Sequence, residues 1–307
     1  MKTVRGLSRK EFDRKFGTNE QCLIYLTTKK WGDSYVCTRC GKNDYVKGKK
    51  QFNRRCSNCG YEESPIANTL FHNIKFDIYK AFGMVYEMMT NKKGASSMRL
   101  GELFEISQNT AWLFRCKIQS YLKSSGEHLL TGLVHVDEFE VGTPKKGKQG
   151  RAKTDEKARA IIAVEIRKNK HRKNKSVIGN AYVKVIKDFS EESLRPIFNE
   201  HIDKLAEIVT DKWSSYQPIA KDYPNMKQVL SNNGANFPEI HVQIRNFKNW
   251  LRGTHSFCDW NKLQHYINEY IYRLNRRNHR GSMVDKLFDR FLNEKAPNYK
   301  DLTALTT

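Results

Sequence analysis

Two short and mainly apolar runs in the second half of the chain each end in an aspartate. Residues 133–136 are followed by Asp137, and residues 207–210 are followed by Asp211. Short β-rich stretches that end in a carboxylate suit the carboxyl edge of a central sheet, where open α/β folds gather ligand-binding side chains. Two carboxylates that converge there are enough to begin a Mg²⁺ site for phosphoryl transfer, because Mg²⁺ takes oxygen ligands. The two runs therefore predict a metal-dependent active site at the edge of a sheet.

The segment between the two aspartates continues the α/β pattern. Residues 158–166 and 178–186 read as strands joined by a basic turn, which predicts antiparallel neighbours. Residues 190–201 read as a helix with Ser190 as its N-cap. Strands, a helix and a further strand in this order predict an α/β domain with a mixed sheet.

Residues 76–122 have a helical pattern that contains one break. After the break, Ser107 is placed to cap a helix that reaches about Tyr121. The two halves read as a helix-turn-helix, whose second helix presents N-terminal polar residues to base edges in the major groove. We expect those residues to be Gln108, Asn109 and Arg115. A helical hairpin without any DNA contact has the same pattern.

Four cysteines form two closely spaced pairs, Cys37 with Cys40 and Cys56 with Cys59, and each pair is followed by glycine. This spacing lets the two turns face one ion and bring four sulfur atoms into a tetrahedron, which predicts a structural zinc ribbon. Two redox-active or incidental motifs are the alternative. A closed four-sulfur site leaves no open position for catalysis, so its expected roles are folding and DNA contact.

The charge of the chain points to a polyanionic partner. Lys and Arg number 55 against 33 Asp and Glu, which gives a formal net charge of +22. Nucleic acid is the first candidate, and a solvated basic surface or ribosome association is the alternative. Residues 142–157 read as a loop or hairpin extension in which Lys145 and Lys146 suit a phosphate backbone.

We expect a cytoplasmic protein that has no contact with a membrane. No apolar run approaches the length of a membrane span, and the N-terminus lacks the apolar core of a signal peptide. The seven cysteines fit a reducing compartment and a metal site better than a disulfide framework.

These motifs together resemble a known family. The ribbon cysteines, Val136-Asp137-Glu138, Thr210-Asp211 and the block from Lys248 to Arg277 are similar to bacterial insertion-sequence transposases of the DDE, RNase H-like superfamily. Within that superfamily the chain resembles the zinc-ribbon, ISXO2-like group. The resemblance implies two-metal-ion cleavage at the 3′ ends of the element, followed by strand transfer into target DNA. It also implies a homodimer or larger assembly on double-stranded DNA.

The resemblance also implies a third metal-site residue. Members of the family carry this residue, often glutamate, seven positions before a lysine, and in this chain that spacing joins His241 to Lys248. Neutral imidazole suits Mn²⁺ better than Mg²⁺, so His241 is expected either to bind the metal or to act on a phosphate or proton. Asn246 and Glu269 compete for the same role, although neither fits the spacing. Lys248 is expected to hold a DNA phosphate near the metals.

One further acidic residue and three arginines lie near these motifs. Glu138 follows Asp137 directly, and because side chains alternate along a strand we expect it to face away from the metals. Arg273, Arg276 and Arg277 are expected to line the DNA path.

The expected fold class is α/β, with an RNase H-like mixed-sheet catalytic domain preceded by a zinc ribbon and a helix-turn-helix domain. The expected domains are a helical segment at 1–30, the ribbon at 31–70, the helix-turn-helix at 71–128 and the catalytic domain at 129–300. Two alternatives remain open. One is a non-transposing nuclease, and the other is a zinc-ribbon DNA-binding regulator whose RNase H-like domain is inactive.

Overall fold

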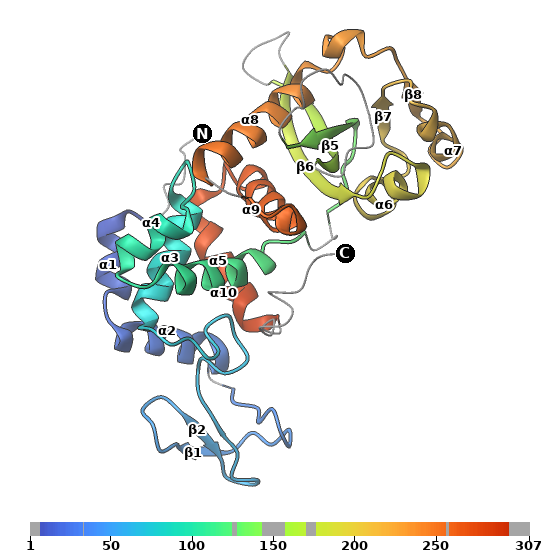
Figure 1. The fold of residues 1–307 in the computed structure, drawn as a ribbon. Coiled ribbons are helices and arrows are strands. Elements are labelled where there is room, and N and C mark those ends of the chain that lie inside the picture. The colour runs from blue at the N-terminus through green and yellow to red at the C-terminus, as the bar shows by residue number, and fades with distance from the viewer. Residues whose placement is uncertain are drawn as a thin grey trace. The chain divides into compact units, whose positions relative to one another are not determined.

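The computed structural model describes residues 7–32, 34–124, 128–142, 157–169, 176–255 and 258–294. The chain forms two compact units, whose elements are shown in Figure 1. The first unit comprises Met1–Tyr121 and Asn278–Ala304, and the second comprises Leu122–Arg277 and Leu305–Thr307. No helix in these described ranges is long and apolar enough to cross a membrane.

Helices form most of the first unit. They are α1 (Arg9–Phe16), α2 (Asn19–Trp31), α3 (Ile78–Thr90), α4 (Ser97–Phe104), α5 (Gln108–Ser120) and α10 (Arg280–Asn293). Hydroxyl side chains cap several N-termini, where backbone N–H groups have no partner within the helix. Ser107 Oγ accepts a hydrogen bond from Thr110 N at 3.2 Å, which confirms the predicted cap of α5.

An aromatic core joins α10 to the helices from the N-terminal part of the chain. The Phe288 ring lies 4.5 Å from the Phe82 ring and 6.0 Å from the Phe71 ring, measured between centroids. Phe288 and Phe291 are fully buried, and α10 packs against α2 and α3. The sequence prediction had instead continued the catalytic domain to residue 300. An amphipathic stripe shows that a helix has a buried face but does not say which core receives it.

A mixed sheet of five strands forms the centre of the second unit, as the sequence predicts. Its strands are β4 (Leu133–Val141), β5 (Ala158–Lys168), β6 (Ser176–Ile186), β7 (Glu207–Thr210) and β8 (Met226–Gln228). They lie in the order β6-β5-β4-β7-β8. Strand β5 is antiparallel to both β4 and β6, whereas β7 is parallel to β4 and β8.

Helices cover both faces of this sheet (Figure 1). They are α6 (Glu191–His201) on one face, and α8 (Pro238–Thr254) and α9 (Leu263–Asn275) on the other. Side chains along β4 point alternately to the two faces of the sheet, so they contribute to a separate hydrophobic cluster on each face. Val134 and Val136 pack with α6, while Phe139 and Val141 pack with α8 and α9.

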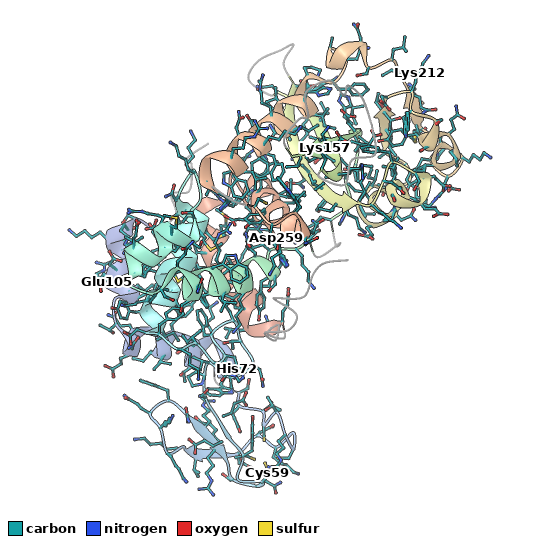
Figure 2. The ribbon with its side chains drawn as sticks, in the orientation of Figure 1. Cys59, His72, Glu105, Lys157, Lys212 and Asp259 are labelled. Carbon is teal, nitrogen blue, oxygen red and sulfur yellow. The ribbon has the colours of Figure 1, made fainter. Side chains whose placement is uncertain are left out.

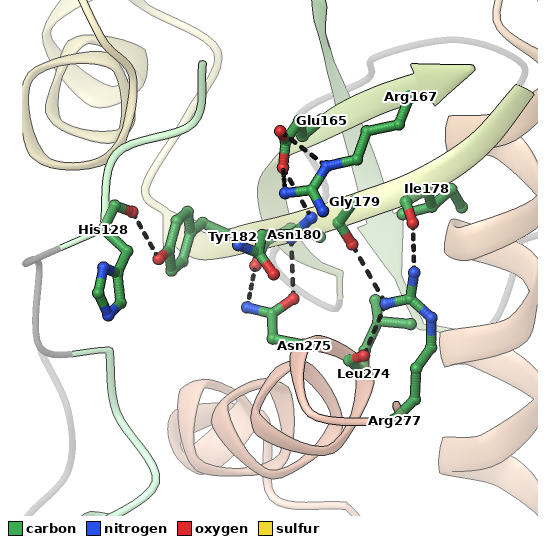
Figure 3. A network of polar contacts seen from close by, with 11 residues as sticks. His128, Glu165, Arg167, Ile178, Gly179, Asn180, Tyr182, Leu274, Asn275 and Arg277 are labelled. Carbon is green, nitrogen blue, oxygen red and sulfur yellow. Dashed lines mark hydrogen bonds and ion pairs between the residues drawn. The ribbon is translucent and has the colours of Figure 1, made fainter. Parts of the chain in front are cut away.

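Side chains of α9 also cover the free edge of β6. The Asn275 amide pairs with Ala181 in both directions, accepting from its N–H and donating to its carbonyl, each at 2.9 Å (Figure 3). Gln264 accepts from Val185 N at 2.8 Å and donates to the Val183 carbonyl at 3.2 Å. Unpaired backbone groups at a sheet edge invite pairing with other chains. The two amides satisfy these groups as a neighbouring strand would.

Arg277 continues this edge contact at the end of α9. Its guanidinium donates to the carbonyls of Gly179 and Leu274, at 3.1 and 2.8 Å, and also to the carbonyl of Ile178 (Figure 3). Burial, followed by the nearby charge of Arg167, lowers the pKa of Arg277. A guanidinium engaged in this way helps to hold α9 on the edge of β6, and the contact between Arg277 and DNA remains a prediction.

We expect Asn275→Ala to lower the free energy of unfolding by about 1–3 kcal/mol, because two backbone groups of β6 lose their partner. Thermal unfolding combined with light scattering checks this, since an uncovered strand edge also favours aggregation. Asn249→Ala is the matched control, because Asn249 is exposed on α8. Equal stability of the two variants would show that the Asn275 amide does not stabilise the edge.

Candidate functional site

The cysteine pairs lie on two similar turns of a small sheet in the first unit. This sheet consists of β1 (Tyr45–Lys47), β2 (Arg54–Cys56) and β3 (Glu62–Glu63), all antiparallel. After the pairs, Gly41 and Gly60 have φ angles of 72° and 68°. Gly41 N donates to the Cys37 carbonyl at 2.9 Å, and Gly60 N donates to the Cys56 carbonyl at 3.0 Å. Only glycine adopts this conformation without strain, which explains its place after each pair.

The four thiols fit a structural zinc ion. The Sγ atoms of Cys37, Cys40, Cys56 and Cys59 all lie within 4.8 Å of one another, and Figure 2 labels Cys59 within this group. The Cys37–Cys59 and Cys40–Cys56 sulfur pairs are 3.6 Å apart. A tetrahedral site with Zn–S bonds of about 2.3 Å needs sulfur separations of roughly 3.8 Å. The arrangement therefore supports the predicted zinc ribbon.

A buried ion pair ties the ribbon to α2. Lys30 Nζ lies 2.8 Å from Glu63 Oε1 and donates to the carbonyls of Ser64 and Ala67 at 3.1 and 2.7 Å. Glu63 is 1% exposed, and Thr38 donates to its other carboxylate oxygen at 3.2 Å. Burial lowers the pKa of Lys30, and the contact with Glu63 opposes that shift. No local pattern identifies this pair in the sequence, because both residues lie next to other charged residues.

The two predicted aspartates come together at the end of β7. The parallel pairing of β4 with β7 ends with His135 opposite Val209. Asp137 and Asp211 each lie two residues beyond this last pair, so they stand side by side. Carboxylate oxygens of Asp137, Glu138 and Asp211 lie within 4.8 Å of one another. These are oxygen ligands of the kind that divalent cations such as Mg²⁺ and Mn²⁺ bind.

Glu138 corrects one prediction. Its residue position belongs to the face of Val134 and Val136, as strand alternation requires, but its carboxylate reaches the two aspartates. Among the described residues, β7 pairs with β4 only as far as His135, so this pairing stops before Glu138. Alternation therefore fixed the face of Glu138 but not the position of its carboxylate.

Tyr216 holds the Glu138 carboxylate from the side of α6. It lies in the short 3-10 helix η1 (Ser214–Tyr216), and its hydroxyl donates to Glu138 Oε2 at 2.8 Å. The Tyr216 side chain is fully buried, and Glu138 is 9% exposed. Burial, followed by the charge of Glu138, raises the pKa of Tyr216 well above its usual value. The hydroxyl therefore keeps its proton and remains a donor.

His241 and Lys248 lie on the face of α8 that is turned toward β4. His241 Nε2 lies 3.6 Å from Asp137 Oδ2, and Lys248 Nζ lies 5.7 Å from the centre of the Phe139 ring. A spacing of seven residues returns to nearly the same helix face, within about 20°. Burial, followed by the charge of Lys248, lowers the pKa of His241. The imidazole is therefore favoured in its neutral form, which is the form that binds metals.

The two competitors of His241 lie elsewhere. Asn246 is exposed and stands about 140° around α8 from His241. Glu269 is fully buried in α9. Among the described residues, neither belongs to the cluster formed by Asp137, Glu138 and Asp211.

The turn before α8 packs directly against His241. Gly234, in the 3-10 helix η2 (Asn232–Gly234), has a φ angle of 85°. A Cβ atom added to it would stand 2.6 Å from His241 Nε2 and 2.7 Å from His241 Cδ2. This close approach positions the imidazole ring. The sequence offered only one hint, which is the Asn-Asn-Gly turn just before the helix.

We expect Gly234→Ala to lower the thermal midpoint by roughly 2–8 °C, because a left-handed conformation costs about 1–2 kcal/mol with a Cβ atom. The same change should also displace the His241 ring. Gly253→Ala is the matched control, since Gly253 lies in α8 and an added Cβ atom there meets nothing within 4 Å. Differential scanning calorimetry of both variants checks the expectation, and it would be contradicted by equal midpoints.

The predicted DNA-contacting residues have different surroundings. Helices α4 and α5 are joined by residues 105–107, where Figure 2 labels Glu105. Gln108 and Asn109 are exposed at the N-terminus of α5, whereas Arg115 is only 1% exposed. Arg115 is therefore corrected from a base contact to a core residue.

The remaining basic candidates lie in the second unit. Lys145 and Lys146 fall outside the described residues. Arg273 is half-buried, and the Arg276 guanidinium stacks on the Tyr272 ring at 3.8 Å from its centre. Arg273 and Arg276 remain predicted DNA contacts.

Two protein families match the chain. Residues 129–275 match the ISXO2-like transposase domain, and residues 17–62 match the transposase zinc-ribbon domain. The first match lies within the second compact unit and contains Asp137, Asp211 and His241. The second match contains all four ribbon cysteines. No curated protein matches the chain.

Several solved structures are similar at low identity. The crystal structure of the Mos1 strand transfer complex has 10% identity and a TM-score of 0.22, covering 67% of this chain and 77% of that chain. The Mos1 transposase paired-end complex with left transposon end has 10% identity and a TM-score of 0.20, covering 68% and 79%. The pre-cleavage Mos1 transpososome has 9% identity and a TM-score of 0.19, covering 69% and 79%. TM-scores this low do not bear on the fold.

Proposed function

We propose that the chain is an insertion-sequence transposase of the zinc-ribbon, ISXO2-like group of the DDE superfamily, and that it cuts and joins the DNA ends of its own element; its matches to the ISXO2-like transposase domain and the transposase zinc-ribbon domain support this proposal. The proposed reactions are metal-dependent cleavage at the 3′ ends of the element and strand transfer into target DNA. The observation that carries this proposal is the meeting of Asp137 and Asp211, with His241 Nε2 only 3.6 Å from Asp137 Oδ2.

The residues at this site fit divalent metal ions. Asp137 and Asp211 offer carboxylate oxygens, and His241 offers a neutral imidazole nitrogen. When bound, Mg²⁺ or Mn²⁺ would activate the attacking oxygen and stabilise the departing oxygen of the scissile phosphodiester. Because imidazole suits Mn²⁺ better than Mg²⁺, we propose that Mn²⁺ supports the reaction better if His241 is a ligand. If His241 instead moves a proton, the two metals should differ less.

Both reactions have the same form at phosphorus. In cleavage, a water oxygen bonds to phosphorus as the bond to the departing 3′ oxygen breaks, and that oxygen takes up a proton. In strand transfer, the freed 3′-hydroxyl loses its proton and attacks a target phosphodiester, which releases another 3′-hydroxyl. One P–O bond forms and one breaks in each step, so no covalent protein intermediate is needed. We propose that Lys248, which lies on the same helix face as His241, holds a phosphate.

DNA binding is assigned to the first unit and to the basic residues of the second. The zinc ribbon and the exposed N-terminus of α5 with Gln108 and Asn109 are the proposed contacts with the element ends. Arg273 and Arg276 are proposed contacts with the phosphate backbone. Since two ends must be held together for joining, we propose that a homodimer or larger assembly acts on double-stranded DNA.

The test uses the DNA that flanks the gene in its native replicon, incubated with purified protein and either Mg²⁺ or Mn²⁺. We expect 3′-end cleavage and strand joining by the wild-type protein and neither reaction by Asp211→Asn. Cutting without joining would identify a non-transposing nuclease. Specific binding of the ends with no cutting in either metal would identify a DNA-binding regulator and remove the catalytic roles.

A further inference from the structure

We propose that one face of the small sheet in the zinc ribbon, the face that carries Tyr45, Lys47 and Arg54, binds the phosphate backbone of duplex DNA. This inference rests on the proposed function, because it assigns the contact between the ribbon and DNA to named residues and to one side of the sheet. The strands concerned are β1 and β2 of the first unit (Figure 1).

The register of the sheet assigns the side chains to its two faces. Lys47 stands opposite Arg54, and Val46 stands opposite Arg55. Residues directly opposite each other in an antiparallel pair share a face, and neighbours along a strand alternate between faces. Arg54 and Arg55 are therefore adjacent in the sequence but lie on opposite faces. Tyr45 is two residues from Lys47, so it shares the face of Lys47 and Arg54.

The two faces differ in charge. Strand β3 places Glu63 opposite Arg54 and Glu62 opposite Arg55. Lys30 reaches Glu63 from α2 at 2.8 Å and neutralises it, so the positive charge of Arg54 is not balanced by this carboxylate. On the other face, Arg55 and Glu62 have opposite charges that cancel. A phosphate backbone is therefore complementary to the face of Arg54.

Aromatic rings fix the guanidinium of Arg54 in place. Its Cζ atom lies 4.1 Å from the centre of the Tyr45 ring, 4.8 Å from that of the Trp31 ring and 5.9 Å from that of the Tyr35 ring. Among the described residues, no acceptor forms a hydrogen bond or an ion pair with this guanidinium. Rings that stack on a guanidinium cover its faces and leave the N–H groups at its edge to bind a phosphate.

The exposure of these side chains also suits a nucleic acid. Tyr45 is 45% exposed, whereas the neighbouring Trp31 and Tyr35 are 5% and 3% exposed. Lys47 is exposed opposite Arg54. Cations beside an exposed aromatic ring form the kind of surface that follows a nucleic-acid backbone. Lys47 and Arg54 would each hold one phosphate.

The experiment measures the affinity of the whole chain, loaded with zinc, for duplex DNA over a range of salt concentrations. The DNA is a duplex of the element end and an unrelated duplex of the same length. The variants are Arg54→Gln and Lys47→Gln, and Arg55→Gln is the matched control on the other face of β2. Zinc content is measured for each variant.

Each lost phosphate contact should reduce the slope of log K against log salt by about 0.9, which corresponds to about eightfold weaker binding at about 0.1 M salt. The loss should be the same for both duplexes, because phosphates carry no sequence information. Arg54→Gln and Lys47→Gln should each show this change and keep their zinc. Arg55→Gln should remain within about twofold of the wild-type protein.

Wild-type slopes in Arg54→Gln and Lys47→Gln, or an equal loss in Arg55→Gln, would overturn this inference. Cutting and joining of the ends by the wild-type protein would then still support the proposed function. Conversely, the expected slopes in a protein that never cuts its ends would support this DNA-binding face and remove the proposed reactions. If Arg54→Gln loses its zinc, Lys47→Gln decides, because Lys47 is exposed and its change leaves the stacked rings in place.

Discussion

Replacing Asp137 with asparagine is expected to slow cleavage of the element ends by about 1000-fold, which corresponds to about 4 kcal/mol of transition-state stabilisation. Asparagine keeps the shape of the side chain but removes the charge that binds a divalent cation. Asp137 lies at the centre of the site, because its carboxylate is close to those of Asp211 and Glu138 and to His241 Nε2. The effect should therefore fall on the chemical step and on metal binding, with no loss of DNA binding.

The measurement is single-turnover cleavage of labelled end DNA in Mn²⁺, with end binding followed in parallel by gel shift. Asp222→Asn is the matched control, because Asp222 is exposed and forms a surface ion pair with Arg195. Its cleavage rate should stay within about twofold of the wild-type rate. A fall of less than tenfold in Asp137→Asn would show that the reaction takes place elsewhere.

Replacing Cys56 with serine is expected to unfold the zinc ribbon and abolish specific binding of the element ends. Structural zinc contributes about 10–16 kcal/mol to folding in small zinc-binding peptides, and a ribbon of this size has little other core. The buried residues that pack around the thiols are Trp31 and Tyr35, so their surroundings should also change. The five-stranded sheet of the second unit should remain folded.

Three measurements on the purified protein check this expectation: its zinc content, its limited proteolysis and a gel shift with end DNA. Cys258→Ser is the matched control, because Cys258 is half-buried in the second unit and lies outside the ribbon. It should keep its zinc and its DNA binding. Full zinc content in Cys56→Ser, or an intact ribbon without zinc, would contradict the structural role of the metal.

The sequence could predict the parts of the site that depend on local pattern. Asp137 and Asp211 each follow an apolar run, and the ends of parallel strands meet at one edge of a sheet. The spacing between His241 and Lys248 places both on one side of a helix wherever that helix packs. The structure brings His241 to Asp137 and leaves Asn246 and Glu269 outside the carboxylate cluster.

Other parts of the site depend on the lengths and ends of neighbouring elements. The Glu138 carboxylate lies within 4.8 Å of those of Asp137 and Asp211, and no pattern within β4 reveals this. Tyr216 meets Glu138 across 78 positions of sequence. Gly234 meets His241 because a turn with positive φ lies over the start of α8. Single-sequence patterns contain no information on such contacts.

The sequence by itself determined the local structures of this protein. The spacing of Cys37, Cys40, Cys56 and Cys59, the strands of the mixed sheet and the cap at Ser107 all follow from backbone geometry within short segments. Only the tertiary structure decided which distant segments meet. It placed α10 in the core of the first unit, buried Arg115, and engaged Arg277 with the edge of β6. It also brought Glu138 and Tyr216 to the two aspartates. The reason is physical: hydrophobic burial is not directional, so a residue's apolar or basic character does not identify its partner until the whole chain has packed.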